Sequence, residues 1–476
     1  MRIPPVKILF FSTDIYRCCQ FSDAGELLMV TAESSEVSTK VMNRWIIVIG
    51  AIMIQVALGA IYAWSAFTTP LQGTETAVSQ FDFSKTETQA IFSAGLAAFS
   101  IFTIIGGRLQ KKYGPRNIAL AGGVLLGLGY ILGSFVGASF PLKLLCIGLI
   151  AGAGIGLSYV VPIAVGVKWF PDKKGLVSGL AVAGFGFGAF IWILLANPPS
   201  ILGFSGLITK QVGAYAYSIV NVDAAFRIYG IAFFLLVIIG SLVMKNPPEH
   251  WKPKGWTAEK QTASKQATIT NLLPNQMLHT KQFYLLWLMF FIGALAGLMV
   301  IGNVQNFAKC PMDGFTCHGF SLGEATDFAV IGAAVSLPIF NGFGRIAWGQ
   351  ISDKIGRRKA LLTMFAFQGI MMMIFFFTTG SPITFYVAAA LIGFNFGGNF
   401  ALFPAATADS FGADNVGLNY GFVFTSYGIG GIVGPILAGA VQDAGMSFFY
   451  AFVPAAIMCF LAAVLAMIYH PEIKKT

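Results

Sequence analysis

One arginine lies inside a long apolar stretch of the sequence, where a charged side chain is costly. Arg345 falls within the stretch 325–350, and Asn341 precedes it by four residues, on the same face of a helix. Charged side chains inside membrane spans usually mark the path of a substrate. A guanidinium also matches a carboxylate in two-point geometry. We therefore predict that Arg345 binds a carboxylate and that Asn341 orients Arg345 or donates to the substrate.

Two other roles remain open for this pair. Arg345 can extend its charge to the membrane surface along its apolar stem, or brace the neighbouring loop. Asn341 can form a hydrogen bond between helices instead of contacting a substrate.

The histidines and cysteines do not indicate a metal or catalytic site. All four histidines fall in loops or near chain ends, at His250, His279, His318 and His470. The six cysteines show no metal-ligand spacing. We therefore expect no metal, no cofactor and no catalytic residues, and the chain is not expected to be an enzyme.

The composition indicates that lipid surrounds most of the chain. Of the 476 residues, 56% are hydrophobic and only 11% are charged, whereas a soluble domain carries about 25% charged residues. The mean hydropathy is +0.74. The net charge of +10 comes mostly from loops between apolar stretches, so it reflects membrane topology rather than binding of nucleic acid.

Twelve stretches are long enough to cross a bilayer, which requires about 20 apolar residues. They cover 45–69, 88–109, 117–138, 142–167, 175–197, 224–244, 283–307, 325–350, 359–379, 383–407, 417–441 and 446–469. We therefore predict an all-α, multi-pass integral membrane protein with twelve transmembrane helices.

The connections define the orientation and the domains. Lys and Arg gather in alternate connections, which places both termini in the cytoplasm, most simply at the plasma (inner) membrane. Residues 42–244 and 283–470 are predicted to form two six-helix bundles, joined by a cytoplasmic linker over 245–282. Residues 1–41 are predicted to be a disordered tail.

The two bundles repeat one another at a constant offset of 242 residues. The matching pairs are Trp45 and Trp287, Gly107 and Gly349, Gly114 and Gly356, Arg116 and Arg358, Pro162 and Pro404, Gly175 and Gly417, Gly186 and Gly428, and Gly188 and Gly430. Two similar bundles that face each other leave a cavity at their seam, and rocking them exposes it to each side in turn.

Two loops resemble the signature of the major facilitator superfamily. GQISDKIGRRK, Gly349 to Lys359, matches the signature between helices 8 and 9, and GRLQKKYGPRN, Gly107 to Asn117, resembles its first-half copy. The copy departs at Gln110, where the family usually has an aspartate. The resemblance implies a gating role for Gly107, Gly114, Arg116, Gly349, Asp353, Gly356, Arg357 and Arg358.

Longer runs narrow the resemblance. Residues 43–67, 167–181, 393–405 and 419–435 look like the oxalate/formate antiporter family, which also resembles monocarboxylate transporters. The resemblance covers about residues 43–470 and implies a carrier of small organic anions. Relatives keep a substrate-binding arginine at the point matching Arg345. Monocarboxylate transporters have an aspartate where this chain has Asn341.

Tyr427 bears on the charge of the substrate. Carriers that resemble this chain and move oxalate have a lysine at the matching point, and two cations suit a dianion. Because an unmatched buried charge is costly, we favour a monocarboxylate such as lactate, pyruvate or formate. Oxalate/formate-type exchange of a dicarboxylate is the alternative.

Aromatic residues are predicted to line the cavity. The resemblance places Tyr62, Tyr159, Phe396, Phe400, Phe424 and Tyr427 there. Tyrosine hydroxyls can bind a carboxylate, and phenyl rings exclude water. The other interpretation is that these rings face lipid or the protein core.

The mode of action remains open between proton symport and anion exchange, and a carboxylate-binding sensor is a second class of function. A monomer is expected. Cys310 and Cys317 share a polar loop and form a disulfide if that compartment is oxidising.

Overall fold

The structure is a computed structural model of the 476-residue chain. It describes residues 9–10, 17–21, 27–31, 42–71, 81–83, 85–196, 207, 209–211, 217–219, 222–248, 251, 253, 271–308, 332–443 and 446–471. These residues belong to two units, Met1–Asn43 and Arg44–Thr476. Cys310 and Cys317, for which a disulfide was considered, lie outside the described residues.

The first unit contains three short antiparallel strands. They are β1 (Leu9–Phe10), β2 (Arg17–Phe21) and β3 (Leu27–Thr31), with Leu9 opposite Cys18 and Cys18 opposite Val30. These strands lie within the segment 1–41, for which a disordered tail was expected; that expectation stays a prediction. Val30, Thr31 and Phe21 are residue types that favour strands.

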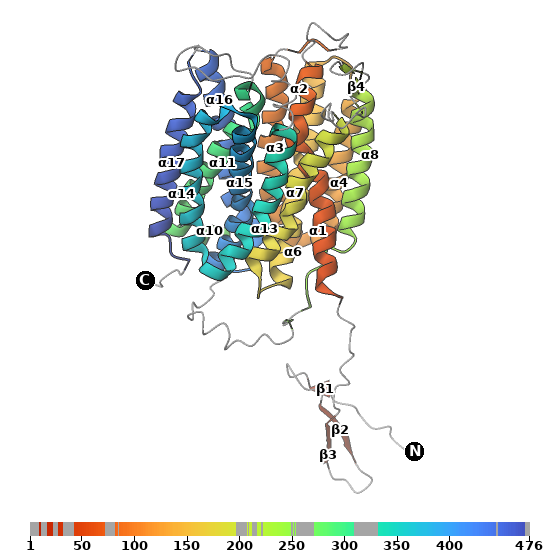
Figure 1. The fold of residues 1–476 in the computed structure, drawn as a ribbon. Helices are drawn as coiled ribbons and strands as arrows, with labels where there is room; N and C mark the ends of the chain where they lie inside the picture. The colour runs from red at the N-terminus through yellow and green to blue at the C-terminus, as the bar shows by residue number, and fades with distance from the viewer. Residues whose placement is uncertain are drawn as a thin grey trace. The chain divides into compact units, whose positions relative to one another are not determined.

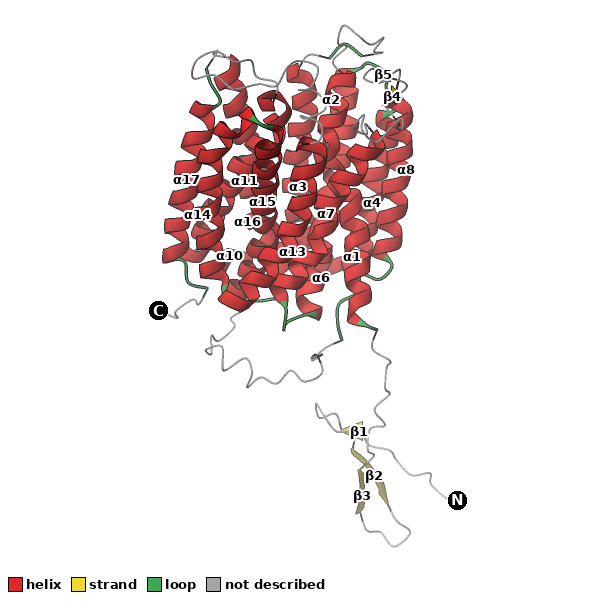
Figure 2. Ribbon diagram, viewed as in Figure 1, coloured by secondary structure: helices red, strands yellow, loops and turns green. Residues whose placement is uncertain are grey.

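The second unit is helical (Figures 1 and 2). Its first half contains α1 (Arg44–Leu58), η1 (Gly59–Trp64), α2 (Ser65–Leu71), α3 (Lys85–Tyr113), α4 (Pro115–Gly133), α5 (Phe140–Lys143), η2 (Leu144–Ile150), α6 (Ala151–Trp169), α7 (Lys174–Ala196) and α8 (Val222–Ser241). A short hairpin, β4 (Thr209–Gln211) with β5 (Tyr217–Ile219), precedes α8.

The second half is also mainly helical. It contains α10 (Pro274–Met277), α11 (Lys281–Ala308), η4 (Gly332–Ser336), α13 (Leu337–Ile355), α14 (Arg357–Phe375), η5 (Phe376–Gly380), α15 (Pro382–Phe411), α16 (Val416–Asp443) and α17 (Phe449–Ile468). When adjoining elements are joined, the described helices account for all twelve predicted spans. Ten of them are long and apolar enough to cross a membrane, and α13 and α16 are outside that set. These two carry Arg345 and Tyr427.

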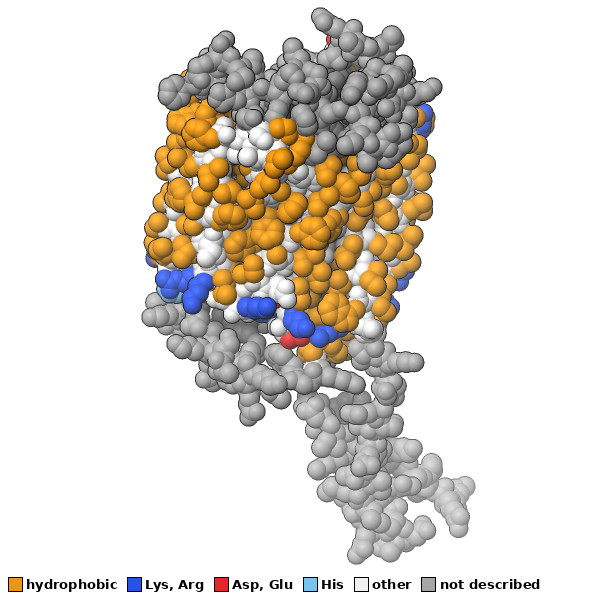
Figure 3. Space-filling model, in the orientation of Figure 1, with side chains coloured by type: hydrophobic (Ala, Val, Ile, Leu, Met, Phe, Trp, Pro, Cys, Tyr) orange, Lys and Arg blue, Asp and Glu red, His pale blue; other side chains and the backbone are white. Residues whose placement is uncertain are grey.

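The outer surface of the helical unit is apolar. Ile49, Phe377 and Ile457 are among its well-exposed side chains, and Figure 3 shows hydrophobic side chains over most of the visible face. Lys and Arg gather along one end of the helices (Figure 3). We call this the basic end; it carries the connections at Gly114 and Gly356, which both have a positive φ angle. The pattern fits a protein whose middle faces lipid.

The two halves meet mainly along two helix pairs, α7 with α13 and α3 with α16, and α7 also contacts α15. Glycines allow the first pair to approach closely. A Cβ atom at Gly179 would lie 2.2 Å from the backbone oxygen of Arg345, and one at Gly186 would lie 2.6 Å from the backbone nitrogen of Gly342. Small residues are how membrane helices achieve such contact. They bring the backbone of α7 against the segment of α13 that carries Arg345.

Gly179→Ala is expected to separate α7 from α13. The added methyl group would overlap with backbone atoms of Arg345. Such overpacking should lower the free energy of unfolding by about 1–3 kcal/mol, so the thermal unfolding midpoint should fall. Gly95→Ala is the control, because a Cβ there meets its nearest atom at 3.7 Å. An unfolding midpoint that falls equally for both variants would contradict the close-contact account.

Candidate functional site

Arg345 lies wholly buried in the middle of α13, at the seam between the two halves. Its Nε donates to the Oδ1 atom of Asn341 over 2.8 Å, one helical turn earlier. Its Nη1 donates to the backbone oxygen of Val182 on α7 over 2.9 Å. The second bond crosses from one half of the protein to the other. Asn341 thus contacts the guanidinium directly, and its role in orienting Arg345 or binding a substrate stays a prediction.

The guanidinium keeps one unused nitrogen. Nη2 of Arg345 is buried and has no hydrogen-bond partner. Its charge has no acidic partner among the ion pairs of the described residues. Aromatic faces partly compensate: the guanidinium carbon lies 4.1 Å from the ring centre of Phe400 and 5.1 Å from that of Phe185. The result is a buried cation with a free donor.

Two tyrosines from opposite halves meet beside this cation. The hydroxyls of Tyr62 on η1 and Tyr427 on α16 lie 2.6 Å apart, and either can be the donor. Tyr62 packs edge-on against Phe185, with ring centres 4.9 Å apart, and Tyr427 lies 5.5 Å from Phe400. Hydroxyls and ring faces therefore share one cluster with Arg345.

The structure brings together all eight residues of the predicted substrate site, which are Arg345, Asn341 and the six aromatic residues. Tyr159 and Phe424 join the cluster with ring centres 5.0 Å apart, and Phe396 lies 5.2 Å from Phe400. All of these side chains are buried inside the helical unit. The rings therefore do not face lipid, and the alternative that they simply pack in the protein core stays open. Their role in binding a substrate stays a prediction.

Three cluster residues were missed from the sequence. Phe99 on α3 packs against Tyr159 edge-on and against Phe424 at a tilt, with ring centres 4.9 Å apart in each pair, and Phe185 contacts the guanidinium. Tyr420, fully buried, lies 5.6 Å from Phe424. The repeat offset of 242 residues would have found the first two, because Phe99 is the counterpart of Asn341 and Phe185 that of Tyr427.

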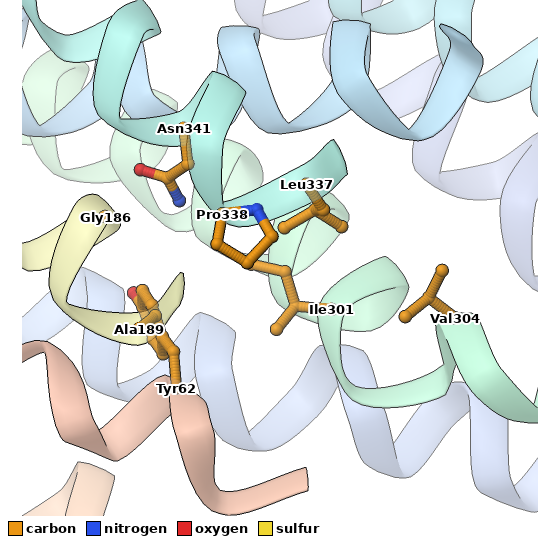
Figure 4. Close-up of a pocket in the computed structure, with 8 residues that line it drawn as sticks. All are labelled: Tyr62, Gly186, Ala189, Ile301, Val304, Leu337, Pro338 and Asn341. Atoms are coloured by element: carbon orange, nitrogen blue, oxygen red, sulfur yellow. The ribbon is translucent and has the colours of Figure 1, made fainter. Parts of the chain in front are cut away.

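A small cavity adjoins the cluster at Tyr62 and Asn341 (Figure 4). Its volume is about 20 Å³, which is room for roughly one water molecule. The polar side chains at its wall are Tyr62 and Asn341. The rest of the wall is small or apolar, from Gly186, Ala189, Ile301, Val304, Leu337 and Pro338. The helices must part before a larger molecule can enter.

The basic end is closed by polar contacts between the halves. Asp353 on α13 accepts from the backbone nitrogens of Gly175 (2.9 Å) and Leu176 (2.7 Å) at the start of α7. Asp409 on α15 pairs with Lys174 of α7 at 2.8 Å. Arg357 joins both carboxylates at 2.7 Å each. We call these side chains, Lys174, Asp353, Arg357 and Asp409, the basic-end gate.

Four of the other predicted gating residues, Gly107, Gly349, Arg116 and Arg358, do not belong to the basic-end gate. A Cβ atom at Gly349 would lie 2.3 Å from the backbone oxygen of Gly175, and one at Gly107 would lie 2.3 Å from that of Gly417, so both glycines permit contact between the halves. Arg116 and Arg358 are exposed at the surface. Their gating role stays a prediction.

Asp353→Ala is expected to weaken the closed basic end. The α7 N-terminus loses a carboxylate cap, which is worth roughly 1–2 kcal/mol, so the open fraction should rise about tenfold. Distances between spin labels at positions 116 and 358, in a background without the native cysteines, measure the opening. Asp172→Ala is the control, because Asp172 pairs with Arg44 of the same half at 2.8 Å. An unchanged distance distribution in Asp353→Ala would contradict the gate.

The first-half copy of the gate was misread from the sequence. At the offset of 242 residues, Gln110 is the counterpart of Ser352, and the counterpart of Asp353 is Lys111. The structure agrees: Lys111 donates to Asn415 just before α16, as Asp353 contacts the start of α7. A cation therefore stands where the other half has a carboxylate.

No group of His, Cys, Asp or Glu within the described ranges is placed to hold a metal ion. The chemistry available at the seam is thus that of one guanidinium, an amide and several phenols.

Known proteins resemble the chain throughout the helical unit. The family described as "Major Facilitator Superfamily" matches residues 41–323 and 311–476. The oxalate:formate antiporter of Oxalobacter formigenes is 29% identical, over 90% of this chain and 92% of its own. The apicoplast pyruvate carrier 1 of Toxoplasma gondii is 26% identical, over 84% of each chain.

Solved structures share the fold. A crystal structure of the transporter FucP in the outward conformation aligns with a TM-score of 0.61 at 15% identity, over 89% of this chain and 98% of that chain.

Proposed function

The chain belongs to the major facilitator superfamily, and on that basis we propose that it is a secondary carrier of small organic anions, with monocarboxylates such as lactate, pyruvate or formate as its cargo. The single observation that carries this proposal is the buried guanidinium of Arg345, whose Nη2 has no partner. Unpaired buried charges are strongly destabilising. A carboxylate at this point supplies the missing charge and accepts from the free nitrogen.

The number of charges favours a monoanion. Among the described residues, the fully buried basic side chains are Arg345 and Lys143. Lys143 is already paired with Asp223 at 2.6 Å and also donates to the backbone oxygen of Gly133. One cation is therefore left for the cargo, and one negative charge neutralises it. A dianion such as oxalate would keep a buried excess charge.

The wall beside the guanidinium favours a short apolar tail. In Figure 4, Ile301, Leu337 and Pro338 surround the cavity that Asn341 and Tyr62 also reach. Because Asn341 both bonds the guanidinium and lines this cavity, we propose that a carboxylate held at Arg345 places its carbon chain toward this wall. Apolar pockets with a few polar groups are typical small-molecule sites.

The relatives support the class of cargo. One is named for oxalate and formate and another for pyruvate. All of these are small carboxylates, and a buried arginine suits each of them.

The closed basic end and the seam fit transport by alternating access. Because basic loops face the cytosol, we propose that the basic end is cytoplasmic, that both termini lie on that side, and that the membrane is the plasma (inner) membrane. The state described here is then closed toward the cytosol.

Uptake by the purified full-length protein in liposomes tests the proposal. Labelled lactate, pyruvate, formate, acetate and oxalate are offered with and without an inward proton gradient, and with each anion preloaded. Uptake of a monocarboxylate that rises with the gradient indicates symport, and uptake that requires preloaded anion indicates exchange. A carboxylate that binds without crossing would replace the carrier proposal with a sensor.

A further inference from the structure

A second pair of tyrosines joins the two halves beside Arg345. Tyr159 on α6 belongs to the first half and Tyr420 on α16 to the second, and both side chains are fully buried. Each packs against the ring of Phe424, with ring centres 5.0 and 5.6 Å apart. The charge of Arg345 acts on both phenols, so this pair surrounds the same cation as Tyr62 and Tyr427.

Neither hydroxyl of this second pair is satisfied. The two hydroxyls interact across the seam, but neither makes a hydrogen bond of normal geometry within the described residues. The first pair differs, because the hydroxyls of Tyr62 and Tyr427 bond each other at 2.6 Å. Most buried side-chain polar atoms in proteins have a partner, so the exception requires an explanation. An unsatisfied buried group costs free energy in this closed state.

The unsatisfied pair lies nearer the basic end than the bonded pair. The helix α16 begins at that end, since Asn415 just before it accepts from Lys111 at the end of α3. Tyr420 precedes Tyr427 by seven residues, which is about 10 Å along a helix. The ring of Phe424 packs against both tyrosines, with its centre 4.7 Å from that of Tyr427. The seam therefore carries a bonded phenol pair and, toward the basic end, an unbonded one.

A contact between the halves seals the unbonded pair. A Cβ atom at Gly417, in the first turn of α16, would lie 3.3 Å from the Cβ atom of Ala164 and 3.7 Å from the Cγ2 atom of Val160, both on α6. Tyr159 and Tyr420 adjoin these positions on the same two helices. Because α6 and α16 belong to different halves, separation of the halves at the basic end parts the two hydroxyls and exposes them to solution on that side.

A small carboxylate suits two such hydroxyls. A phenol O–H can donate to an ionised oxygen, and hydrogen bonds to charged oxygens are shorter and stronger than those between neutral groups. Two phenols can donate to the two oxygens of one carboxylate. Because neither phenol is charged, they add no second cation to the single one that a monoanion neutralises.

We propose that Tyr159 and Tyr420 form a second position for the carboxylate of the cargo, which we call the basic-end site. The site is sealed in the state described here, and opening of the basic end makes it available between Arg345 and the solution. The carboxylate then moves from the guanidinium to the two phenols as it leaves on this side, and in the reverse order as it enters. This inference rests on the proposed carrier function.

The test measures lactate binding to purified full-length protein by calorimetry, in two backgrounds. The first is the wild type. The second, the open background, combines Asp353→Ala with Lys174→Ala and so removes the contacts of the basic-end gate that join the halves. Spin labels at positions 116 and 358 report its opening.

Three variants are made in each background. Tyr420→Phe and Tyr159→Phe each remove one hydroxyl of the basic-end site. Tyr229→Phe is the matched control, because Tyr229 is also buried but lies within the first half, where its hydroxyl donates to the backbone oxygen of Trp192.

In the open background, we expect Tyr420→Phe and Tyr159→Phe to weaken lactate binding about tenfold, because each loses a bond to a charged oxygen. In the wild type, where the site is sealed, their lactate affinity should change little. Tyr229→Phe should bind lactate as its parent does in both backgrounds. The unfolding midpoint should fall for Tyr229→Phe, which loses a bond, and should not fall for Tyr420→Phe, which loses an unsatisfied group.

Unchanged lactate affinity of both variants in the open background would overturn the basic-end site. An equal loss of affinity in both backgrounds would also overturn it, because that result indicates a structural effect on the central cluster. Lactate that binds neither the wild type nor the open background would refute the carrier function itself, and the basic-end site with it.

Discussion

Arg345→Ala is expected to lower monocarboxylate transport by roughly 100-fold or more. Truncating one partner of a buried, hydrogen-bonded charge pair costs about 2–5 kcal/mol, and each 1.4 kcal/mol is a factor of ten. The variant also removes an unpaired buried charge from the empty protein. We therefore expect its unfolding midpoint to be unchanged or higher, which separates loss of binding from loss of fold.

Two further variants sharpen this prediction. Arg345→Lys keeps the charge but loses the two-point geometry, so part of the transport should survive. Arg227→Ala is the control, because Arg227 lies near the start of α8 with its guanidinium carbon 5.4 Å from the ring centre of Phe135, away from the cluster. Initial uptake rates in liposomes give the comparison. Uptake by Arg345→Ala at the wild-type rate would show that transport does not require this arginine.

Tyr427→Lys is expected to change the preferred cargo from a monocarboxylate to oxalate. The new ammonium would lie beside Tyr62, whose hydroxyl is 2.6 Å from that of Tyr427. Two cations would then neutralise a dianion, whereas a monoanion would leave one charge buried. We expect the ratio of oxalate to lactate uptake to rise by roughly 100-fold, the scale of about 3 kcal/mol.

Tyr427→Phe is the matched control for this change. It removes the hydroxyl bond to Tyr62 without adding charge, so it should keep the preference for monocarboxylates at a lower rate. Competition between labelled lactate and unlabelled oxalate measures the preference. A Tyr427→Lys variant that folds and still prefers lactate would show that the count of cations does not select the cargo.

Much of the helical fold could be predicted because the membrane restricts the choices. Backbone groups in lipid must be satisfied within a helix, so apolar stretches of about 20 residues become helices. Arg345 was recognisable for the same reason, since a charge in such a stretch is costly. The constant offset of 242 residues between matching motifs also predicted the organisation into two bundles.

The partners of Arg345 could not be predicted from the sequence. The bond to Val182 uses a backbone oxygen, and every residue has one. It depends on the close approach of α7 and α13 at Gly179, which the sequence shows only as one more glycine. Gln110 was taken as the point where the loop copy departs, whereas the offset of 242 residues makes Lys111 the counterpart of Asp353.

The strands of the first unit were missed for a different reason. The segment 1–41 was judged by its difference from the membrane pattern. Short strands are indicated instead by local residue preference, such as that of Val30 and Thr31 in β3.

A crystal structure with 3-bromopropionate tests the central claim most directly, because anomalous scattering locates the bromine and density locates the carboxylate. The account predicts the carboxylate against Nη2 of Arg345, near the hydroxyls of Tyr62 and Tyr427. The bromine should then lie toward Ile301 and Leu337. A fully occupied ligand elsewhere, with Nη2 of Arg345 bound to a protein group instead, would contradict the assignment of this arginine as the carboxylate site.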